Sequence, residues 1–189
     1  LGVDPFWFQL ETRLFPDFDV EDQKSQRNLA DAVDGMIADL SNLYKKHGID
    51  DRPFVFLKNN SGTYGLAVTS VNSGSDVLEW GYRQRKRLKA AKGGRDVKEL
   101  IIQEGVPTDL THQGAVAEPV VYMVGCQTVG LFYRYHPERS HKESLNAPGS
   151  FFEKKLVSEL STLEHWVCRA GLIALGLEAH AMGISFKKD

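Results

Sequence analysis

The chain has 189 residues, of which 42% are hydrophobic and 25% are charged, and its formal net charge is -2. This length allows one sizeable core, or a core with a small lobe. The near-neutral charge argues against a protein whose overall field attracts nucleic acid or an anionic membrane. The two cysteines, Cys126 and Cys168, form no Cys-x-x-Cys motif, so we expect two free thiols, with a single disulfide as the alternative.

No signal peptide or spanning segment opens the chain. Its most apolar stretch, Ala170 to Leu177, is far shorter than the ~20 residues that a bilayer requires. We therefore expect a cytoplasmic protein without a membrane partner. Because the first residue is Leu1 rather than methionine, we also expect the chain to be part of a longer one.

The first predicted element is a long helix. Residues 1–22 are rich in aromatic and acidic side chains without a clear period, which indicates a connecting or packing segment. From Gln23 to a stop at Gly48, apolar side chains recur every three or four residues, which predicts an amphipathic helix. An apolar strand over 54–58, a glycine-containing loop and a second strand over 66–71 are predicted next.

The remaining elements are a helix, a buried strand, a hairpin and a tail. The helix is predicted over 76–91, after a capping polar cluster, and the buried strand over 97–103. Two strands over 115–124 and 128–135 are expected to pair, and a loop over 137–150 precedes a helical tail from Phe151 to Gly183. This order is typical of an α+β fold rather than of βαβ alternation.

The strand over 54–58 ends in a lysine beside a small-residue loop, Gly62-Thr63-Tyr64-Gly65. Lys58 ends an apolar run, where a charge must either leave the sheet or meet an anion. Glycines let backbone N–H groups approach a phosphate closely. A plain hairpin with Lys58 in water is the alternative. Neither the Walker pattern nor G-x-G-x-x-G is present, so a hairpin-type phosphate flap fits better than a P-loop.

Two further segments carry candidate binding groups. Gln103, Glu104, Gly105 and Val106 follow the buried strand, so we expect backbone groups there to lose their ladder partners and to become free for a planar base. An ordinary strand end is the alternative.

Glu118 lies inside an apolar strand, and Arg134 on the paired strand is its candidate partner. The pair is either structural or a site wall that faces a cation and a phosphate. In the polar loop, Glu143 and Asn146 offer oxygen ligands that suit Mg²⁺. His136 and His141 lack the spacing of a metal pair. A basic run from Arg83 to Arg95 favours a solvated helix face, with nucleic-acid binding or contact with a triphosphate as alternatives.

Five stretches together resemble the proteobacterial glutamate–cysteine ligase family of the ATP-grasp class. They are Phe54–Lys58, Gly62–Gly65, Ile102–Val106, Ala115–Met123 with Ala-Val-Ala-Glu-Pro-Val-Val-Tyr-Met, and Leu145–Gly149 with Leu-Asn-Ala-Pro-Gly. The last two are the most specific.

The resemblance implies an ATP-grasp ATP-binding region over residues 23–189, with a glycine-rich phosphate flap. It implies the first step of glutathione biosynthesis, in which ATP phosphorylates the γ-carboxylate of glutamate and the amine of cysteine displaces phosphate.

Carried onto this chain, the family's roles give Lys58 the ATP phosphates and let Gly62, Thr63, Tyr64 and Gly65 close over them. Gln103, Glu104, Gly105 and Val106 would form the nucleotide-binding strand end, with the last three lining adenine. Arg134 would stabilise the transferring phosphoryl group or the acyl phosphate. Glu118, Glu143 and Asn146 would be the Mg²⁺ ligands.

The expected partners are the small molecules glutamate, cysteine and ATP, and a homo-oligomer stays open. Two alternatives remain. One is another ATP-grasp peptide or glutathione-type ligase, and the other is a non-catalytic nucleotide- or nucleic-acid-binding module.

Overall fold

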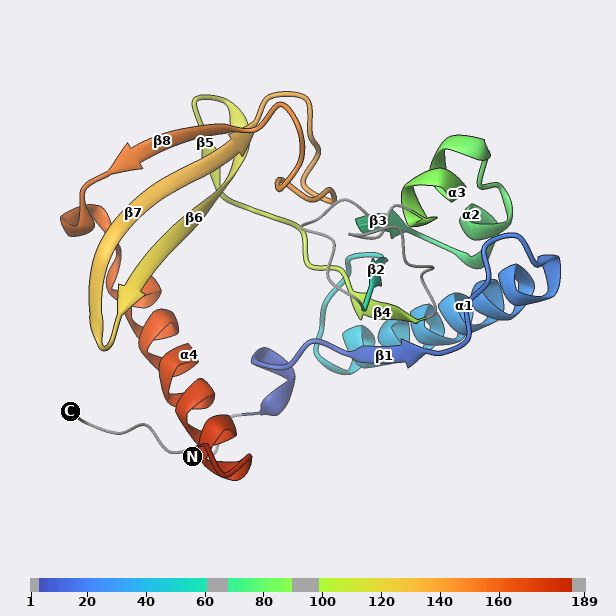
Figure 1. The fold of residues 1–189 in the computed structure, drawn as a ribbon, viewed down its shortest axis with the longest axis horizontal. Helices are drawn as coiled ribbons and strands as arrows, with labels where there is room; N and C mark the ends of the chain where they lie inside the picture. Colours follow the sequence, from blue (N-terminus) through green and yellow to red (C-terminus); the bar gives the residue numbers. More distant parts are fainter. Residues whose placement is uncertain (1–3, 61–67, 90–98, 185–189) are drawn as a thin grey trace. The chain divides into compact units, whose positions relative to one another are not determined.

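The structure is a computed structural model that describes residues 4–60, 68–89 and 99–184. It divides into two compact units, shown with the labelled elements in Figure 1. Unit 1 comprises Leu1–Asp109 and Glu138–Pro148, and unit 2 comprises Leu110–Pro137 and Gly149–Asp189. Every described strand pair is antiparallel, which confirms the prediction of antiparallel sheets with helices.

Unit 1 contains a 4-stranded sheet in the order β1-β4-β2-β3. Its strands are β1 (Thr12–Phe15), β4 (Leu100–Glu104), β2 (Val55–Asn59) and β3 (Val68–Val71). In β2 and β4, buried and partly buried side chains alternate. The buried apolar ones, Leu57 and Ile102 among them, belong to the same core cluster as the buried apolar side chains of α1. The sheet therefore has a face that packs against the helix and an outer face.

Helix α1 (Gln23–Lys46) agrees with the predicted helix. Asp22 caps its first turn, because the carboxylate accepts from the N–H groups of Lys24 and Ser25 at 3.1 and 3.0 Å. Leu29, Val33, Met36 and Leu40 are almost completely buried. Gly48 follows the helix in the left-handed region, at φ 69°, as a helix stop requires.

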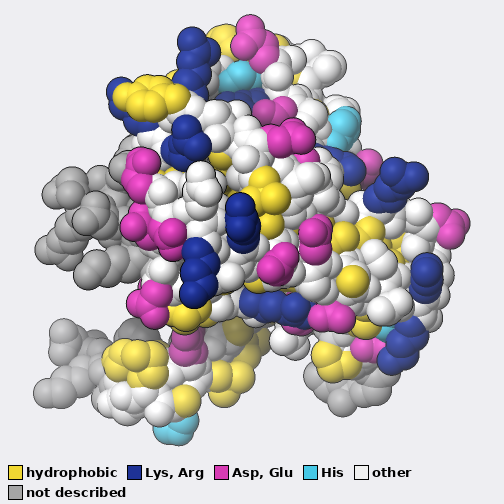
Figure 2. Space-filling view, turned by 90° about the vertical axis from the view of Figure 1, so that its right-hand side faces the viewer, with side chains coloured by type: hydrophobic (Ala, Val, Ile, Leu, Met, Phe, Trp, Pro, Cys, Tyr) yellow, Lys and Arg dark blue, Asp and Glu magenta, His cyan; other side chains and the backbone are white. Residues whose placement is uncertain are grey.

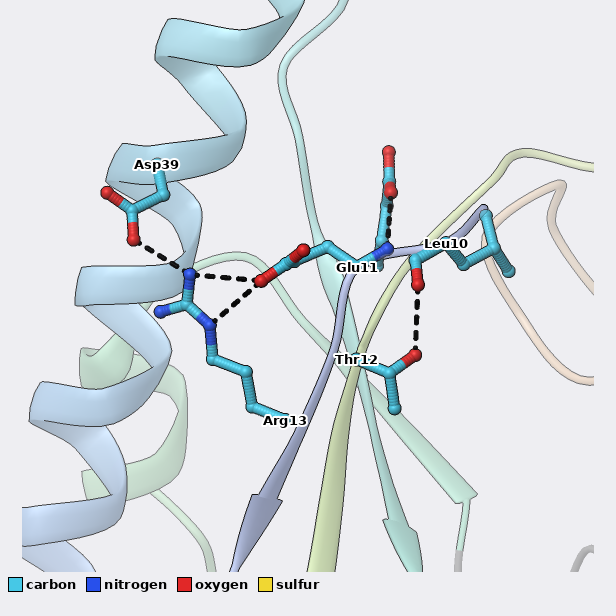
Figure 3. Close-up of polar contacts among 6 residues, drawn as sticks. Leu10, Glu11, Thr12, Arg13 and Asp39 are labelled. Carbon is cyan, nitrogen blue, oxygen red and sulfur yellow. Dashed lines mark hydrogen bonds and ion pairs between the residues drawn. The ribbon is translucent and has the colours of Figure 1, made fainter. Parts of the chain in front are cut away.

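The segment over 1–22, predicted to connect, contains two elements that its composition did not indicate. They are the short 3-10 helix η1 (Pro5–Trp7) and the edge strand β1, which pairs with β4. Arg13 of β1 reaches Asp39 of α1 at 2.7 Å and Glu11 at 3.3 Å, as Figure 3 shows. This part of the segment is thus held to both the sheet and the helix.

The single helix predicted over 76–91 is wrong, because two helices lie there: α2 (Gly74–Leu78) and α3 (Tyr82–Lys89). Trp80 lies between them and is buried in the core of unit 1. Gly81 follows it, and glycine is a poor helix former. Burial of the indole therefore takes the chain out of the helix.

Unit 2 contains a 4-stranded sheet in the order β5-β6-β7-β8. The long hairpin of β6 (Ala115–Val124) and β7 (Gln127–His136) confirms the predicted strand pair, and β5 (Thr111–His112) lies beside β6. The helical tail predicted from Phe151 is wrong at its start, because β8 (Phe151–Lys155) pairs with β7 there. A 3-10 turn, η2 (Val157–Glu159), follows β8.

Helix α4 (Thr162–Ala181) begins at a capping box. Ser161 Oγ accepts from Glu164 N–H at 3.2 Å, and Glu164 accepts from Ser161 N–H at 2.7 Å. Much of its apolar surface is exposed, with Leu163 at 73% and Trp166 at 65%. In the described part of the chain, no helix is long and apolar enough to cross a membrane. Both cysteines, Cys126 and Cys168, are free thiols, as predicted.

The contact between α1 and α2 leads to a first prediction. A Cβ on Gly74 would lie 2.5 Å from the carbonyl oxygen of Ala30, whereas one on Gly35 would meet nothing within 4 Å. We expect Gly74→Ala to lower the free energy of unfolding by about 1–3 kcal/mol, because backbone must move. Gly35→Ala, inside the exposed face of α1, should raise it by about 0.5–1 kcal/mol. Urea unfolding measures both, and equal effects would contradict the close approach.

Candidate functional site

Lys58 lies on the outer face of the unit 1 sheet. Its neighbours Leu57 and Asn59 are buried, so the alternation of β2 directs Phe56 and Lys58 away from the helix-packed face. In the register of the sheet, Gln103 lies opposite Phe56, and Ile101 lies opposite Lys58. The predicted strand with a lysine near its end is therefore confirmed.

The ammonium group of Lys58 meets a neutral partner. Its Nζ donates to Gln103 Oε1 and lies 5.6 Å from the centre of the Phe56 ring. Among the described residues, no carboxylate lies within ion-pair distance of it. Burial lowers the pKa of Lys58, because the charged form loses water. A half-buried cation of this kind is suited to an anionic ligand.

The loop over 138–148 belongs to unit 1 and lines a small polar pocket of about 100 Å³ with residues of β2 and β3. Phe56, Val68, Thr69 and Ser70 form the sheet side of this pocket. The loop side contains Arg139, Glu143, Ser144, Asn146 and Ala147. The structure thus brings two predicted site residues, Glu143 and Asn146, to the edge of the sheet that carries Lys58.

Glu143 is already engaged within this loop. Its Oε2 accepts from Ser140 N–H at 2.9 Å, and its Oε1 lies 2.5 Å from Arg139 Nη1. The hydrogen bond from the Ser140 backbone lowers the pKa of Glu143, and Arg139 adds to this effect. Both oxygens of this predicted magnesium ligand therefore have partners.

Arg134 and Glu118 pair directly across β7 and β6 in unit 2. Arg134 Nε and Nη2 both lie 2.5 Å from Glu118 Oε1. The pairing expected from sequence is confirmed. In this arrangement, however, Arg134 and Glu118 compensate each other's charge, and neither is free for a ligand.

The three predicted magnesium ligands do not form a prepared metal site as they stand. Both carboxylates, Glu118 and Glu143, are held by arginines. Within the described ranges, no group of three or more His, Cys, Asp or Glu could hold a metal ion. The roles of Glu118, Glu143 and Asn146 in binding Mg²⁺ stay predictions.

The strand end at Glu104 borders a cavity of about 460 Å³. Glu104, Gly105 and Val106 line it together with aromatic residues of the N-terminal segment and with Tyr44 of α1. Gln103 lies instead on the outer face with Lys58. The structure thus separates Gln103 from the three residues predicted to line adenine.

The expectation that the strand-end amides are free is wrong for two of them. Glu104 N–H donates to Glu11 O, and Gly105 N–H donates to Phe54 O, both at 2.8 Å. The Glu104 carboxylate is buried and accepts from Tyr44 Oη at 2.8 Å and from Glu11 N–H at 3.0 Å. Burial and this hydrogen bond raise the pKa of Tyr44. Segments distant in sequence therefore form hydrogen bonds with the backbone groups at the end of β4.

The glycine loop Gly62-Thr63-Tyr64-Gly65 lies outside the described residues. Of the basic run from Arg83 to Arg95, most residues either lie outside the described ranges or have side chains that are not described. Arg83 and Lys86 of α3 are exposed. On the face shown in Figure 2, basic and acidic side chains are interspersed rather than gathered in one basic patch.

Sequence reasoning missed Thr12, Tyr44 and Arg139. Gln103 Nε2 donates to Thr12 Oγ1 at 3.0 Å, Tyr44 binds Glu104, and Arg139 binds Glu143. The strand Thr12–Phe15 has only four residues, so its alternation of polar and apolar side chains was too short to indicate a strand. The spacing of Arg139 and Glu143 by four residues was visible but has no meaning outside a helix until the loop is folded.

A family model described as GshA, glutamate-cysteine ligase, matches residues 1–172. Among solved structures, the chain is similar to the crystal structure of a protein assigned as a gamma-glutamylcysteine synthetase from Methylobacillus flagellatus KT, at 32% identity and a TM-score of 0.69. No curated protein matches the chain significantly.

The similarity to the Methylobacillus protein covers 81% of this chain and 37% of that one. The chain therefore corresponds to well under two thirds of that protein's length.

The hydrogen bonds of Glu143 predict a pH-dependent contribution to stability. Because the pKa of Glu143 is lowered in the folded state, its contribution is complete above the unfolded value of about 4.3 and is lost as pH falls through the folded value. We expect Glu143→Gln to be less stable than the parent protein at pH 7, with a smaller difference at pH 3. Urea unfolding at both values measures this. Glu79→Gln, at an exposed carboxylate, is the control, and a difference independent of pH would contradict the ionic origin.

Proposed function

The chain belongs to the glutamate–cysteine ligase family, and from this premise we propose that it is the ATP-binding part of an ATP-dependent carboxylate–amine ligase. The proposed fold class is ATP-grasp, and the proposed product is γ-glutamylcysteine, the first intermediate of glutathione biosynthesis. Such a ligase would work in the cytoplasm on ATP, glutamate and cysteine.

One observation carries the proposal: the ammonium group of Lys58 has a neutral amide, and no described carboxylate, as its partner. On other strands, Arg13, Arg134 and Lys155 are each bound to carboxylates, and Lys154 is exposed to solvent. A cation without a counter-ion at a half-buried position attracts phosphate oxygens. The attraction is stronger there than in bulk water, because the effective dielectric constant is lower. We assign Lys58 to the ATP phosphates. The loop Gly62 to Gly65 would close over them.

The base of ATP would lie at the strand end. Because the N–H groups of Glu104 and Gly105 are engaged, a base edge would bind other backbone groups of this segment, such as the carbonyl of Gly105 and the N–H of Val106. Val106 has an exposed apolar side chain, with 55% of its surface accessible. The buried carboxylate of Glu104 holds the strand end in place rather than contacting the ligand.

Arg134 is the second proposed catalytic residue. Its guanidinium would stabilise the charge on the transferring phosphoryl group or on the acyl phosphate. To do so it must share or leave its contact with Glu118. A bound Mg²⁺ would neutralise part of the negative charge of the phosphates. Glu118 and Glu143 are both held by arginines, so neither carboxylate is prepared to bind the metal.

The proposed reaction has two steps. An oxygen of the glutamate γ-carboxylate attacks the γ-phosphorus of ATP, so that an acyl phosphate forms and ADP leaves. The amine nitrogen of cysteine then attacks the acyl carbon, phosphate leaves with its bonding electrons, and the nitrogen loses a proton. This chemistry asks the protein mainly for positioning and for neutralisation of developing charge, which Lys58 and Arg134 would supply.

We expect Lys58→Met to raise the Kd for ATP about tenfold or more and to lower the rate of ATP-dependent phosphate release by a similar factor. One hydrogen bond to a charged group in a closed site is worth about 1.5–3 kcal/mol. Lys24→Met, at an exposed lysine of α1, is the matched control. Isothermal titration and a phosphate-release assay on the full-length protein measure the effects, and equal affinities for the two variants would count against the assignment.

Substrate choice is tested by ADP release from the full-length protein with glutamate and a panel of amines. Glutamate with cysteine should stimulate release most strongly. Stronger stimulation by a dipeptide would favour the alternative, a peptide or glutathione-type ligase.

A further inference from the structure

The outer face of the unit 1 sheet holds a hydrogen-bonded row that crosses three strands. Thr12 of β1 lies directly opposite Gln103 of β4, and Gln103 lies directly opposite Phe56 of β2. Lys58, two residues beyond Phe56, leans across to Gln103. The row therefore ends at the cation to which the phosphates are assigned.

Each contact in this row has a defined direction. The Thr12 hydroxyl donates to the Leu10 carbonyl at 3.2 Å, as Figure 3 shows. Gln103 Nε2 donates to Thr12 Oγ1 at 3.0 Å. Lys58 Nζ then donates to Gln103 Oε1. The hydroxyl of Thr12 has its hydrogen directed at Leu10, so its oxygen is left to accept.

These directions determine how the Gln103 amide is oriented. The oxygen and nitrogen of a glutamine amide occupy nearly the same space, so shape alone does not choose between the two orientations. A reversed amide would point its NH₂ group at the Lys58 ammonium, which has only donors. It would also point its carbonyl at an oxygen whose hydrogen is used elsewhere. Thr12 and Lys58 thus select the same orientation.

A neutral acceptor at position 103 affects the Lys58 ammonium differently from a carboxylate or an apolar side chain. A carboxylate there would bind the ammonium more strongly, but it would cancel the charge that an anionic ligand needs. An apolar side chain would leave the half-buried ammonium without an acceptor. The Gln103 amide fixes the direction of the Lys58 side chain and leaves the charge of the ammonium uncompensated.

We propose that Gln103 is a positioning residue that acts through Lys58, and that Thr12 of the edge strand orients its amide. This proposal rests on the proposed function, in which Lys58 binds the ATP phosphates. It gives Gln103 a role different from contact with the adenine base. It also gives β1, at the edge of the sheet, a part in nucleotide binding without any contact with nucleotide.

The test combines two measurements on the full-length protein. The first is the pKa of Lys58 without ligand, from NMR titration of lysine side chains labelled with ¹³C at Cε and assigned with Lys58→Met. The second is the Kd for ATP.

We expect Gln103→Glu to raise the pKa of Lys58 and to weaken ATP binding about tenfold, because a carboxylate stabilises and neutralises the ammonium. Gln103→Met should lower this pKa further, because the charged form loses its acceptor, and should weaken binding severalfold.

Thr12 is tested separately, at an exposed position where replacement disturbs no core. Thr12→Val should shift both quantities in the direction of Gln103→Met but by less, and Thr12→Ser, which restores the hydroxyl, should recover most of the loss. Thr111→Val, at an exposed threonine of unit 2, controls for the type of substitution. Circular dichroism and urea unfolding establish that each variant is folded.

Two results would overturn the proposal. One is an unchanged Lys58 pKa in both Gln103 variants. The other is an unchanged Kd for ATP in both, while Lys58→Met weakens binding. An unchanged Kd in Lys58→Met itself would instead contradict the proposed function, and the pKa measurement would still report whether Gln103 contacts Lys58.

Discussion

Packing of α1 against a single face of the unit 1 sheet determines what the other face can do. Val33 and Leu40 of the helix share a core with Leu57 and Ile102 of the strands. Because side chains alternate along a strand, burial of Leu57 obliges Lys58 to point outward. A slip of one residue in register would bring the ammonium into the core, so the hydrophobic pattern specifies the position of the charge.

The character of the site follows from the partner that this charge receives. Arg13, Arg134 and Arg139 each meet a carboxylate: the first two pairs join different elements, and the third lies within the loop over 138–148. Lys58 meets an amide, which holds the side chain and leaves its charge uncompensated among the described residues. The loop that presents Glu143 and Asn146 lines a small polar pocket with Phe56 of β2 and with residues of β3. Unit 1 therefore carries both a cation without a described counter-ion and a small polar pocket.

Local periodicity was enough to predict α1, β2 and the hairpin of β6 and β7, since each has a repeating apolar pattern over its length. It was also enough to place Glu118 and Arg134 on paired strands. The edge strands β1 and β8 were missed, because a strand of four or five residues is fixed by its partner rather than by its own pattern. The same cause explains the wrong expectation at Glu104 and Gly105, whose amides bind Glu11 and Phe54, both distant in sequence. Burial of Trp80, a tertiary effect, divided the predicted helix. The ligase reaction came from family motifs, because no spacing of residues specifies glutamate or cysteine.

The most direct test of this account is a crystal structure of the full-length protein with a non-hydrolysable ATP analogue. The account predicts that Lys58 Nζ lies within hydrogen-bonding distance of a phosphate oxygen, with Gln103 still bound to Thr12 and the base beside Val106. An analogue bound elsewhere, with Lys58 directed into solvent, would contradict it.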